Sequence, residues 1–187
     1  MNQANYLTDQ FIIAMPTQAD PNFFHTVAYL CQHNEDGALG IVINRSTDMK
    51  LGEIFKQMDI IVASPASAEA PVFLGGPVQQ ERGFVVHTSG GDWHASMAIS
   101  ETISLTTSRD VLEAIAAGEG PEQYLVALGY AGWGAGQLEK EILDNAWLNT
   151  PCGKQVLFDT SINLRWRAAA KQIGIDINRL TAPAGHG

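Results

Sequence analysis

The sequence predicts one mixed α/β (α+β) domain over residues 1–187, with helices packed against a mixed sheet. Strand and helix patterns alternate irregularly along the chain, two strand patterns meet at a turn at 34–37, and a strand pattern enters a helix through glycines near 132–136. Because the first half is rich in hairpins, a mixed sheet fits better than a strictly alternating parallel sheet. This length can bury a core without a metal or disulfide and leaves room for a small sub-lobe.

In the first half, the apolar run at 11–15 predicts a buried strand that Pro16 ends. Residues 26–33 and 39–43 predict a hairpin, because the turn between them carries Gly37, which tolerates a positive φ. A short helix is expected at 51–58, where apolar residues recur at helical spacing: Leu51, Ile54, Phe55 and Met58. Residues 63–71, rich in Ala, Ser and Pro, predict a surface loop.

In the second half, strands are expected at 72–74, 84–87, 99–105, 124–131 and 156–158. Helices are expected at 108–117, about 137–146 and 163–173. Ser108 and Asn163 are the expected N-caps, and Gly118 and Gly174 the expected stops. The end at 183–187 is expected to fray.

The net charge of −9 argues against a broad surface for nucleic acid, because phosphate binding depends on Lys and Arg. The charge is uneven: residues 150–187 hold five basic against two acidic side chains, so the first 149 residues carry −12. Arg165, Arg167 and Lys171 form a basic helix pattern that could contact phosphates. We favour the alternative, that they are the solvated face of an amphipathic helix.

Residues 1–10 contain no Lys or Arg, and no stretch reaches the roughly 18 apolar residues that span a bilayer. We therefore expect a cytoplasmic protein that does not enter a membrane. Hydrophobic residues make up 45% of the chain, which argues against disorder for its bulk. Cys31 and Cys152 show neither metal spacing nor a disulfide framework, and Cys31 is expected to be an inert core thiol.

The strongest local signal is the glycine-rich turn between the strand at 124–131 and the following helix. Its candidate ligand-binding residues are Gly132, Trp133, Gly134, Gly136 and Gln137. Helix N-termini expose unpaired N–H groups that can hold an anion. The turn lacks a Gly-Lys-Ser/Thr ending and the dinucleotide spacing. The favoured interpretation is a tight strand–helix connection with Trp133 packed on the core, and the alternative is a ligand-binding turn.

Two further groups are weaker candidates for the same anionic ligand. Gly75, Gly76 and Pro77 form a turn that could expose N–H groups, although a structural turn is the simpler explanation. Asn44 and Arg45 end a predicted strand, and the guanidinium could clamp a carboxylate or phosphate or form a surface ion pair.

A catalytic set is harder to find. None of the five histidines forms a His-x-x-x-His pair, but His87 and His94 flank the segment 89–93, where a metal or general base is conceivable. There is no Gly-x-Ser-x-Gly elbow. The sequence therefore predicts no catalytic residue and no metal site, leaves any cofactor unknown, and favours a non-enzyme.

Five stretches together resemble the AlgH/YqgE family of bacterial proteins, and they span nearly the whole chain in order: 11–16 with 20–23, 33–45, 75–78, 129–139 and 147–148. The resemblance implies a compact α/β fold with a strongly bent mixed sheet. It also implies the label of transcriptional regulator, attached through alginate production in pseudomonads, and it implies no catalytic residue. Ser46 departs from the proline that many members have there, which changes the rigidity of the turn.

A direct transcription factor should show a helix-turn-helix or a basic region, and the sequence shows neither. We therefore expect a regulatory protein that acts through a protein partner or a small ligand. The alternative is an enzyme or sensor with an anionic ligand at the glycine-rich turns. An oligomer is also conceivable, because four tryptophans can exceed the capacity of one core: Trp93, Trp133, Trp147 and Trp166.

Overall fold

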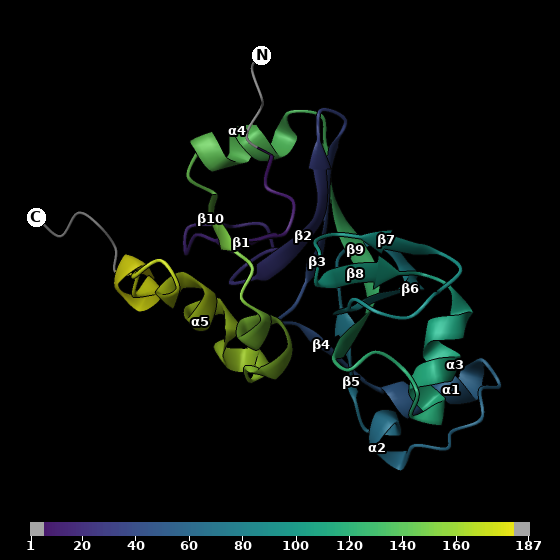
Figure 1. The fold of residues 1–187 in the computed structure, drawn as a ribbon. Helices are drawn as coiled ribbons and strands as arrows, with labels where there is room; N and C mark the ends of the chain where they lie inside the picture. Colours follow the sequence, from purple (N-terminus) through teal and green to yellow (C-terminus); the bar gives the residue numbers. More distant parts are fainter. Residues whose placement is uncertain (1–5, 182–187) are drawn as a thin grey trace, which may run out of the picture. The chain divides into compact units, whose positions relative to one another are not determined.

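The computed structural model describes residues 6–181, and its contacts divide the chain into two compact units (Figure 1). Unit 1 contains the residues up to Asn44 and those from Ala131 onwards, and unit 2 is Arg45–Tyr130. The strand β9 (Tyr124–Gly134) crosses this boundary and contributes to both. The predicted end at 183–187 lies outside the described residues.

The sheet of unit 1 is antiparallel throughout. Its strands follow the order β10-β1-β2-β3-β9: β10 (Trp147–Pro151), β1 (Gln10–Ala14), β2 (Val27–Asn34), β3 (Gly37–Val42) and the last part of β9. The predicted hairpin is confirmed, because β2 pairs with β3 across the expected turn. A bulge between Leu30 and Gln32 interrupts this pairing, and bulges bend a strand and increase its twist.

Two helices pack on this sheet. α4 (Gln137–Leu143) lies against β3 and β10, and α5 (Arg165–Lys171) against β1, β2 and β10. Leu138 of α4 packs on alternate strand residues, which form the core beneath the helix: Ile12, Ala14, Ala28, Leu30, Val42, Ala131, Trp133 and Trp147. Trp166 anchors α5, since its indole N–H donates to the Ala14 carbonyl at 2.9 Å.

Unit 2 mixes strand directions, as the sequence predicts. Its elements are β4 (Ser46–Lys50), α1 (Leu51–Gln57), α2 (Pro65–Ala68), β5 (Pro71–Leu74), β6 (Val78–Thr88), β7 (Ser96–Ala98), β8 (Ile103–Thr106), α3 (Arg109–Ala117) and the first part of β9. β5 runs parallel to β9, whereas β6 runs antiparallel to it. The mixed α/β fold class is therefore confirmed.

The core of unit 2 lies where α1 and α3 meet one face of its strands (Figure 1). Helical spacing brings Leu51, Ile54 and Phe55 of α1, and Val111, Leu112, Ile115 and Ala116 of α3, into one cluster with strand residues Val72, Val85 and Val126. α3 begins after Ser108 and ends at Gly118, whose φ of 80° is left-handed. Both predicted boundaries are therefore confirmed.

Three predictions near the C-terminus are wrong. Residues 156–158 belong to a π-helical turn (Gln155–Asp159) rather than a strand, because so short an apolar run has no period that separates the two. The helix predicted to 146 ends at Leu143, and the chain then forms β10, which the sequence analysis missed. A 3-10 turn (Ile162–Leu164) precedes α5, so Asn163 is not its N-cap, and another 3-10 turn (Ile177–Thr181) follows α5.

Smaller differences occur in unit 2. The predicted loop at 63–71 contains the single turn α2, with Pro65 at its start, and runs into β5 at Pro71. The predicted strand at 99–105 begins only at Ile103 in β8, because the Ser100 hydroxyl accepts the N–H groups of Thr102 and Ile103 and closes a turn. β7 was not predicted.

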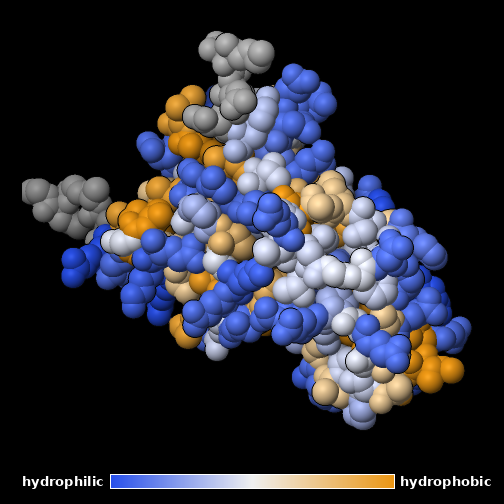
Figure 2. Space-filling view, in the orientation of Figure 1, coloured by the Kyte–Doolittle hydropathy of each residue, from blue (hydrophilic) through white to orange (hydrophobic). Residues whose placement is uncertain are grey.

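The exposed surface carries separate apolar patches on a polar background in the face that Figure 2 shows. Ile61 and Leu143 are the most exposed large apolar side chains in the described residues, at 88% and 82%. No helix between residues 6 and 181 has both the length and the apolar character to cross a membrane. The tryptophans that suggested an oligomer are buried in unit 1, except Trp93, which packs half-buried on the unit 2 core. The oligomeric state stays a prediction.

Candidate functional site

The glycines of the turn in unit 1 are exposed, but several groups of the turn have partners within the protein. The Gly134 N–H donates to the Gln137 side-chain oxygen at 2.9 Å, and Gly136 takes a left-handed φ of 74° just before α4. Trp133 is buried, and its ring stacks on Phe23 at 5.8 Å. These contacts account for the turn as a strand–helix connection. Its ligand-binding role stays a prediction.

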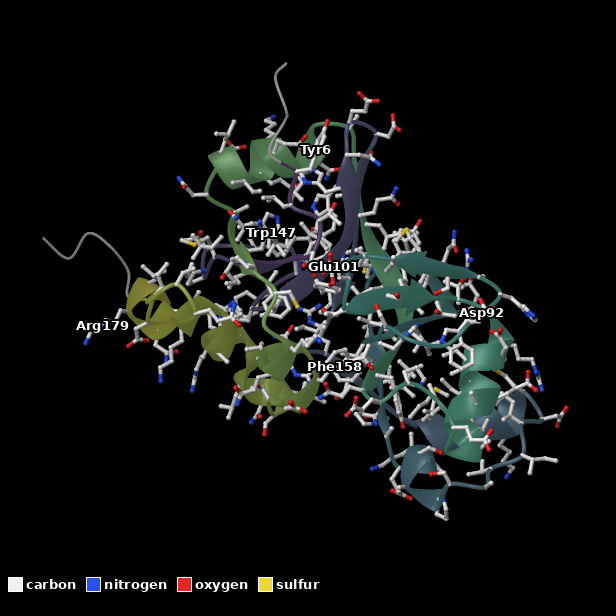
Figure 3. The ribbon with its side chains drawn as sticks, in the orientation of Figure 1. Tyr6, Asp92, Glu101, Trp147, Phe158 and Arg179 are labelled. Carbon is white, nitrogen blue, oxygen red and sulfur yellow. The ribbon has the colours of Figure 1, made fainter. Side chains whose placement is uncertain are left out.

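Glu141 accepts hydrogen bonds from three side chains of this region. The sequence analysis did not single it out. One carboxylate oxygen accepts the indole N–H groups of Trp133 at 3.1 Å and Trp147 at 2.9 Å. The other oxygen accepts from the Gln137 amide at 2.9 Å. Trp147 lies on β10, on the sheet face that α4 covers (Figure 3). The i, i+4 spacing of Gln137 and Glu141 was the only signal in the sequence.

A second carboxylate of α4 anchors the hairpin strand β2. The Glu139 carboxylate lies 3.0 Å from His33 Nε2, and His33 Nδ1 accepts the Leu7 N–H at 2.9 Å. The neutral ring therefore carries its proton on Nε2, and this N–H donates a hydrogen bond to the Glu139 carboxylate. Partial burial raises the pKa of Glu139, but the hydrogen bond from His33, a backbone hydrogen bond and the electrostatic effect of His33 together outweigh burial, and the pKa lies below its usual value. Tyr6 packs edge-on against His33 (Figure 3).

In unit 2, the turn at Gly75, Gly76 and Pro77 is shaped by close backbone contact. The Gly75 N–H donates to the Leu128 carbonyl at 2.8 Å. A Cβ atom on Gly75 would collide with the Gly129 carbonyl oxygen, and one on Gly129 would collide with the Gly76 carbonyl oxygen. The approach of β5 to β9 therefore explains the glycines at positions 75 and 129.

Asn44 and Arg45 fall on different sides of the unit boundary. The Asn44 side chain accepts the Val27 N–H at 2.9 Å and donates to the His25 carbonyl at 2.8 Å, so it fixes the start of β2. The Arg45 carbonyl accepts the Leu74 N–H at 2.8 Å, which places its backbone beside the turn at Gly75. The structure thus brings together only part of the predicted set within unit 2: Arg45, Gly75, Gly76 and Pro77.

Unit 2 also contains a cavity of about 470 Å³, which the sequence analysis missed. It lies among α1, α3 and the strands, and six apolar side chains line most of it: Met49, Ile54, Met58, Leu112, Val126 and Leu128. Gln57, Glu81, Thr107, Ser108 and Arg109 supply the polar part of the lining. Its volume lies within the roughly 300–1,000 Å³ of small-molecule sites.

One glycine of β6 leaves this cavity open. Gly83 pairs with Leu128, and Val85 pairs with Val126. Directly paired residues point to the same sheet face, and Val85 and Val126 both belong to the core under α1 and α3. A Cβ on Gly83 would point to that face and would meet nothing within 4 Å. Position 83 therefore has room for a side chain that the sequence does not supply.

The histidines of unit 2 offer no support for a metal site. Nδ1 of the buried His87 bonds to the Thr88 carbonyl at 2.8 Å, and Nε2 to the Thr106 hydroxyl at 2.7 Å. His94 Nδ1 lies 3.5 Å from Asp110. Among residues 6–181, no three His, Cys, Asp or Glu side chains gather as metal ligands would.

We expect His87 to make the protein less stable in mild acid. Burial lowers its pKa below the ordinary 6.5, and the hydrogen bond to Thr88 offsets this only in part. The unfolded chain then binds a proton that the folded chain resists, so the free energy of unfolding falls as the pH drops below about 6.5. Urea unfolding between pH 7.5 and about pH 5 measures this. A His87→Gln variant with the same pH slope as the parent would contradict the assignment.

We expect both cysteines to resist alkylation in the folded protein. Burial raises the pKa of the Cys31 thiol, and it raises the pKa of Cys152 to about 12 with a further contribution from Asp9. The thiolate is the reactive form, so iodoacetamide at pH 8 should modify neither thiol until urea unfolds the chain. Mass spectrometry reads the adducts, and rapid native labelling of Cys31 would contradict the expectation that it is an inert core thiol.

Comparisons with known proteins identify the family of this chain. The AlgH-like family (DUF179) matches residues 11–178, and the chain belongs to this family. A UPF0301 protein of Thioalkalivibrio sulfidiphilus is 55% identical over the full length of both chains, and one of Methylococcus capsulatus is 52% identical over 100% of this chain and 99% of its own.

Two solved structures share the fold. The solution structure of the AlgH protein from Pseudomonas aeruginosa is 47% identical, covers both chains completely and has a TM-score of 0.80. The crystal structure of a Corynebacterium diphtheriae protein covers 98% of this chain and 95% of its own, with a TM-score of 0.75 at 16% identity. This second likeness concerns the fold alone.

Proposed function

We propose that the protein is a non-enzymatic regulatory protein of the AlgH type that acts by binding a small ligand or a protein partner, and not by holding DNA directly. The observation that carries the proposal is the open, mostly apolar cavity of unit 2. Small-molecule sites are concave and mainly apolar, with a few polar groups that orient the ligand.

The basic C-terminal segment supports the second half of the proposal. Arg165, the first basic residue of α5, is buried at 5% exposure. Its guanidinium donates to the Thr160 and Ile43 carbonyls, each at 2.9 Å. Arg165 therefore has a structural role within unit 1, and the basic side chains that α5 exposes to solvent are Arg167 and Lys171. The whole chain has a net charge of −9. Two exposed cations on a helix are few for a helix that would contact DNA phosphates.

A thermal-shift screen with apolar amines and acids, sugar phosphates and nucleotides tests the proposal. A ligand at about 100 times its dissociation constant adds roughly 2.7 kcal/mol of stability and raises the melting temperature by several degrees. A pull-down from cell extract tests the partner-binding form. Tight duplex DNA binding with a steep salt dependence, beside a flat ligand screen and no stoichiometric partner, would overturn the proposal.

The alternative function is an enzyme or sensor for an anionic ligand at the glycine-rich turns. The observation that favours it is the position of the Arg45 backbone beside the turn at Gly75. This alternative expects inorganic phosphate or a small dicarboxylate to raise the melting temperature, and Arg45→Ala to abolish the shift. Equal shifts in the parent and in Arg45→Ala would remove it.

A further inference from the structure

We propose that the unit 2 cavity binds a small hydrophobic cation, an elongated apolar molecule whose polar end carries a positive charge. The inference rests on the proposed function in its small-ligand form and names the chemical class of that ligand. Two independent features carry it, the composition of the wall and the charge at the edge.

The apolar wall of the cavity favours a ligand with an apolar body. The six apolar side chains come from four different elements and face a space of about 470 Å³. Met49 and Met58 are unbranched and can adapt to the shape of a bound molecule. Each buried methylene of a ligand gains affinity by leaving water, so a linear or aromatic hydrocarbon body suits this wall.

The charged residues that line the cavity favour a ligand with a positive charge. Glu81 lines the cavity and is exposed, and within the described residues its carboxylate has no hydrogen-bond or ion-pair partner. The other charged lining residue, Arg109, already lies 3.7 Å from Glu113 within its own helix. A cationic end can therefore meet the carboxylate of Glu81, whereas an anionic end must compete with Glu113 for Arg109.

The charge of the whole unit acts in the same direction. Residues 45–130 contain five Lys or Arg against eleven Asp or Glu, a net charge of −6. The summed field of so acidic a unit attracts cations and repels anions at its surface. A carboxylate ligand of the same length would enter against this field.

The experiment uses a fluorescent probe and two matched competitors on the full-length protein. N-phenyl-1-naphthylamine, an uncharged aromatic that brightens in apolar surroundings, reports occupancy of the cavity. Decyltrimethylammonium and decanoate have linear hydrocarbon chains of nearly the same length and opposite charges, and both are used below their micelle concentrations. We expect the cation to displace the probe at a concentration at least about fivefold lower than decanoate.

Three variants assign the binding to this site. Gly83→Leu places a side chain inside the cavity without backbone strain, and it should abolish probe binding. Arg82→Leu is the matched control: the Arg82 guanidinium lies over the Phe84 ring, on the opposite face of β6, so binding should persist. Glu81→Gln should weaken the cation roughly two- to fivefold and leave decanoate no weaker.

The outcomes separate the ligand class from the binding function. If Gly83→Leu abolishes binding but both competitors act equally, the cavity is a ligand site and the charge assignment is wrong. If the probe and both competitors fail to bind, or bind unchanged to a Gly83→Leu variant that circular dichroism shows to be folded, the cavity proposal is overturned. Should the leucine variant unfold, Gly83→Ala adds one methyl group, and unchanged probe affinity in that variant would count against the site.

Discussion

Glu141→Ala is expected to lower the free energy of unfolding by about 2–4 kcal/mol, since it removes the shared acceptor of two buried indole N–H groups. Trp133 and Trp147 are 5% and 1% exposed, so neither ring can turn to solvent without leaving the core. An unsatisfied buried donor costs about 1–3 kcal/mol, and here one substitution leaves two. Urea unfolding followed by tryptophan fluorescence measures the loss directly, because the reporting rings are the affected ones.

The control is Glu141→Gln, which keeps a carbonyl oxygen within reach of both indoles. Its amide group cannot accept from Gln137, so we expect a smaller loss, about 1 kcal/mol. Alanine and glutamine variants of equal stability would show that the carboxylate oxygen is not the shared acceptor that the contacts indicate. Both variants leave unit 2 unchanged in sequence, and probe binding to its cavity should persist in either.

Local patterns predicted most of the fold where one short-range signal decides the structure. α3 is an example, because Ser108, the apolar stripe and Gly118 all agree on one helix. β10 was missed for the opposite reason: the spacing of Leu138 and Ile142 continues to Ala146, while Asn145 adopts a φ of 62° and redirects the chain into a strand. Whether the chain continues as a helix there depends on pairing between β10 and β1, which lies far away in sequence.

The candidate site shows more clearly that local sequence patterns miss what distant strand pairing determines. Glycines are visible in a sequence, but the reason for each is not: Gly75 and Gly129 admit a neighbouring backbone, whereas Gly83 faces empty space. No local pattern distinguishes these cases, because they differ only in what the register of β6, β5 and β9 places opposite them. The cavity of unit 2 was therefore out of reach of sequence reasoning.

Gly129→Ala is expected to lower the free energy of unfolding by about 3 kcal/mol or more, a larger loss than for the other glycine-to-alanine substitutions that we propose. Gly129 has a φ of 79°, which costs an alanine about 1–2 kcal/mol. The added Cβ would also collide with the Gly76 carbonyl oxygen and lie 3.1 Å from that of Val78. Relief requires β9 to move away from the turn at Gly75, which breaks the Gly75–Leu128 hydrogen bond.

Gly136→Ala separates the two contributions, because Gly136 has nearly the same φ, 74°, with nothing within 4 Å of its Cβ position. It should lose only the conformational part, about 1–2 kcal/mol, and the remaining difference measures the close approach of the two backbones. Thermal unfolding of both variants gives the comparison. Equal losses would mean that the turn relaxes freely around position 129, and Gly75 and Gly76 would then need an explanation other than packing. In that case a ligand at the turn, with Arg45 beside it, would become the stronger reason for glycine at both positions.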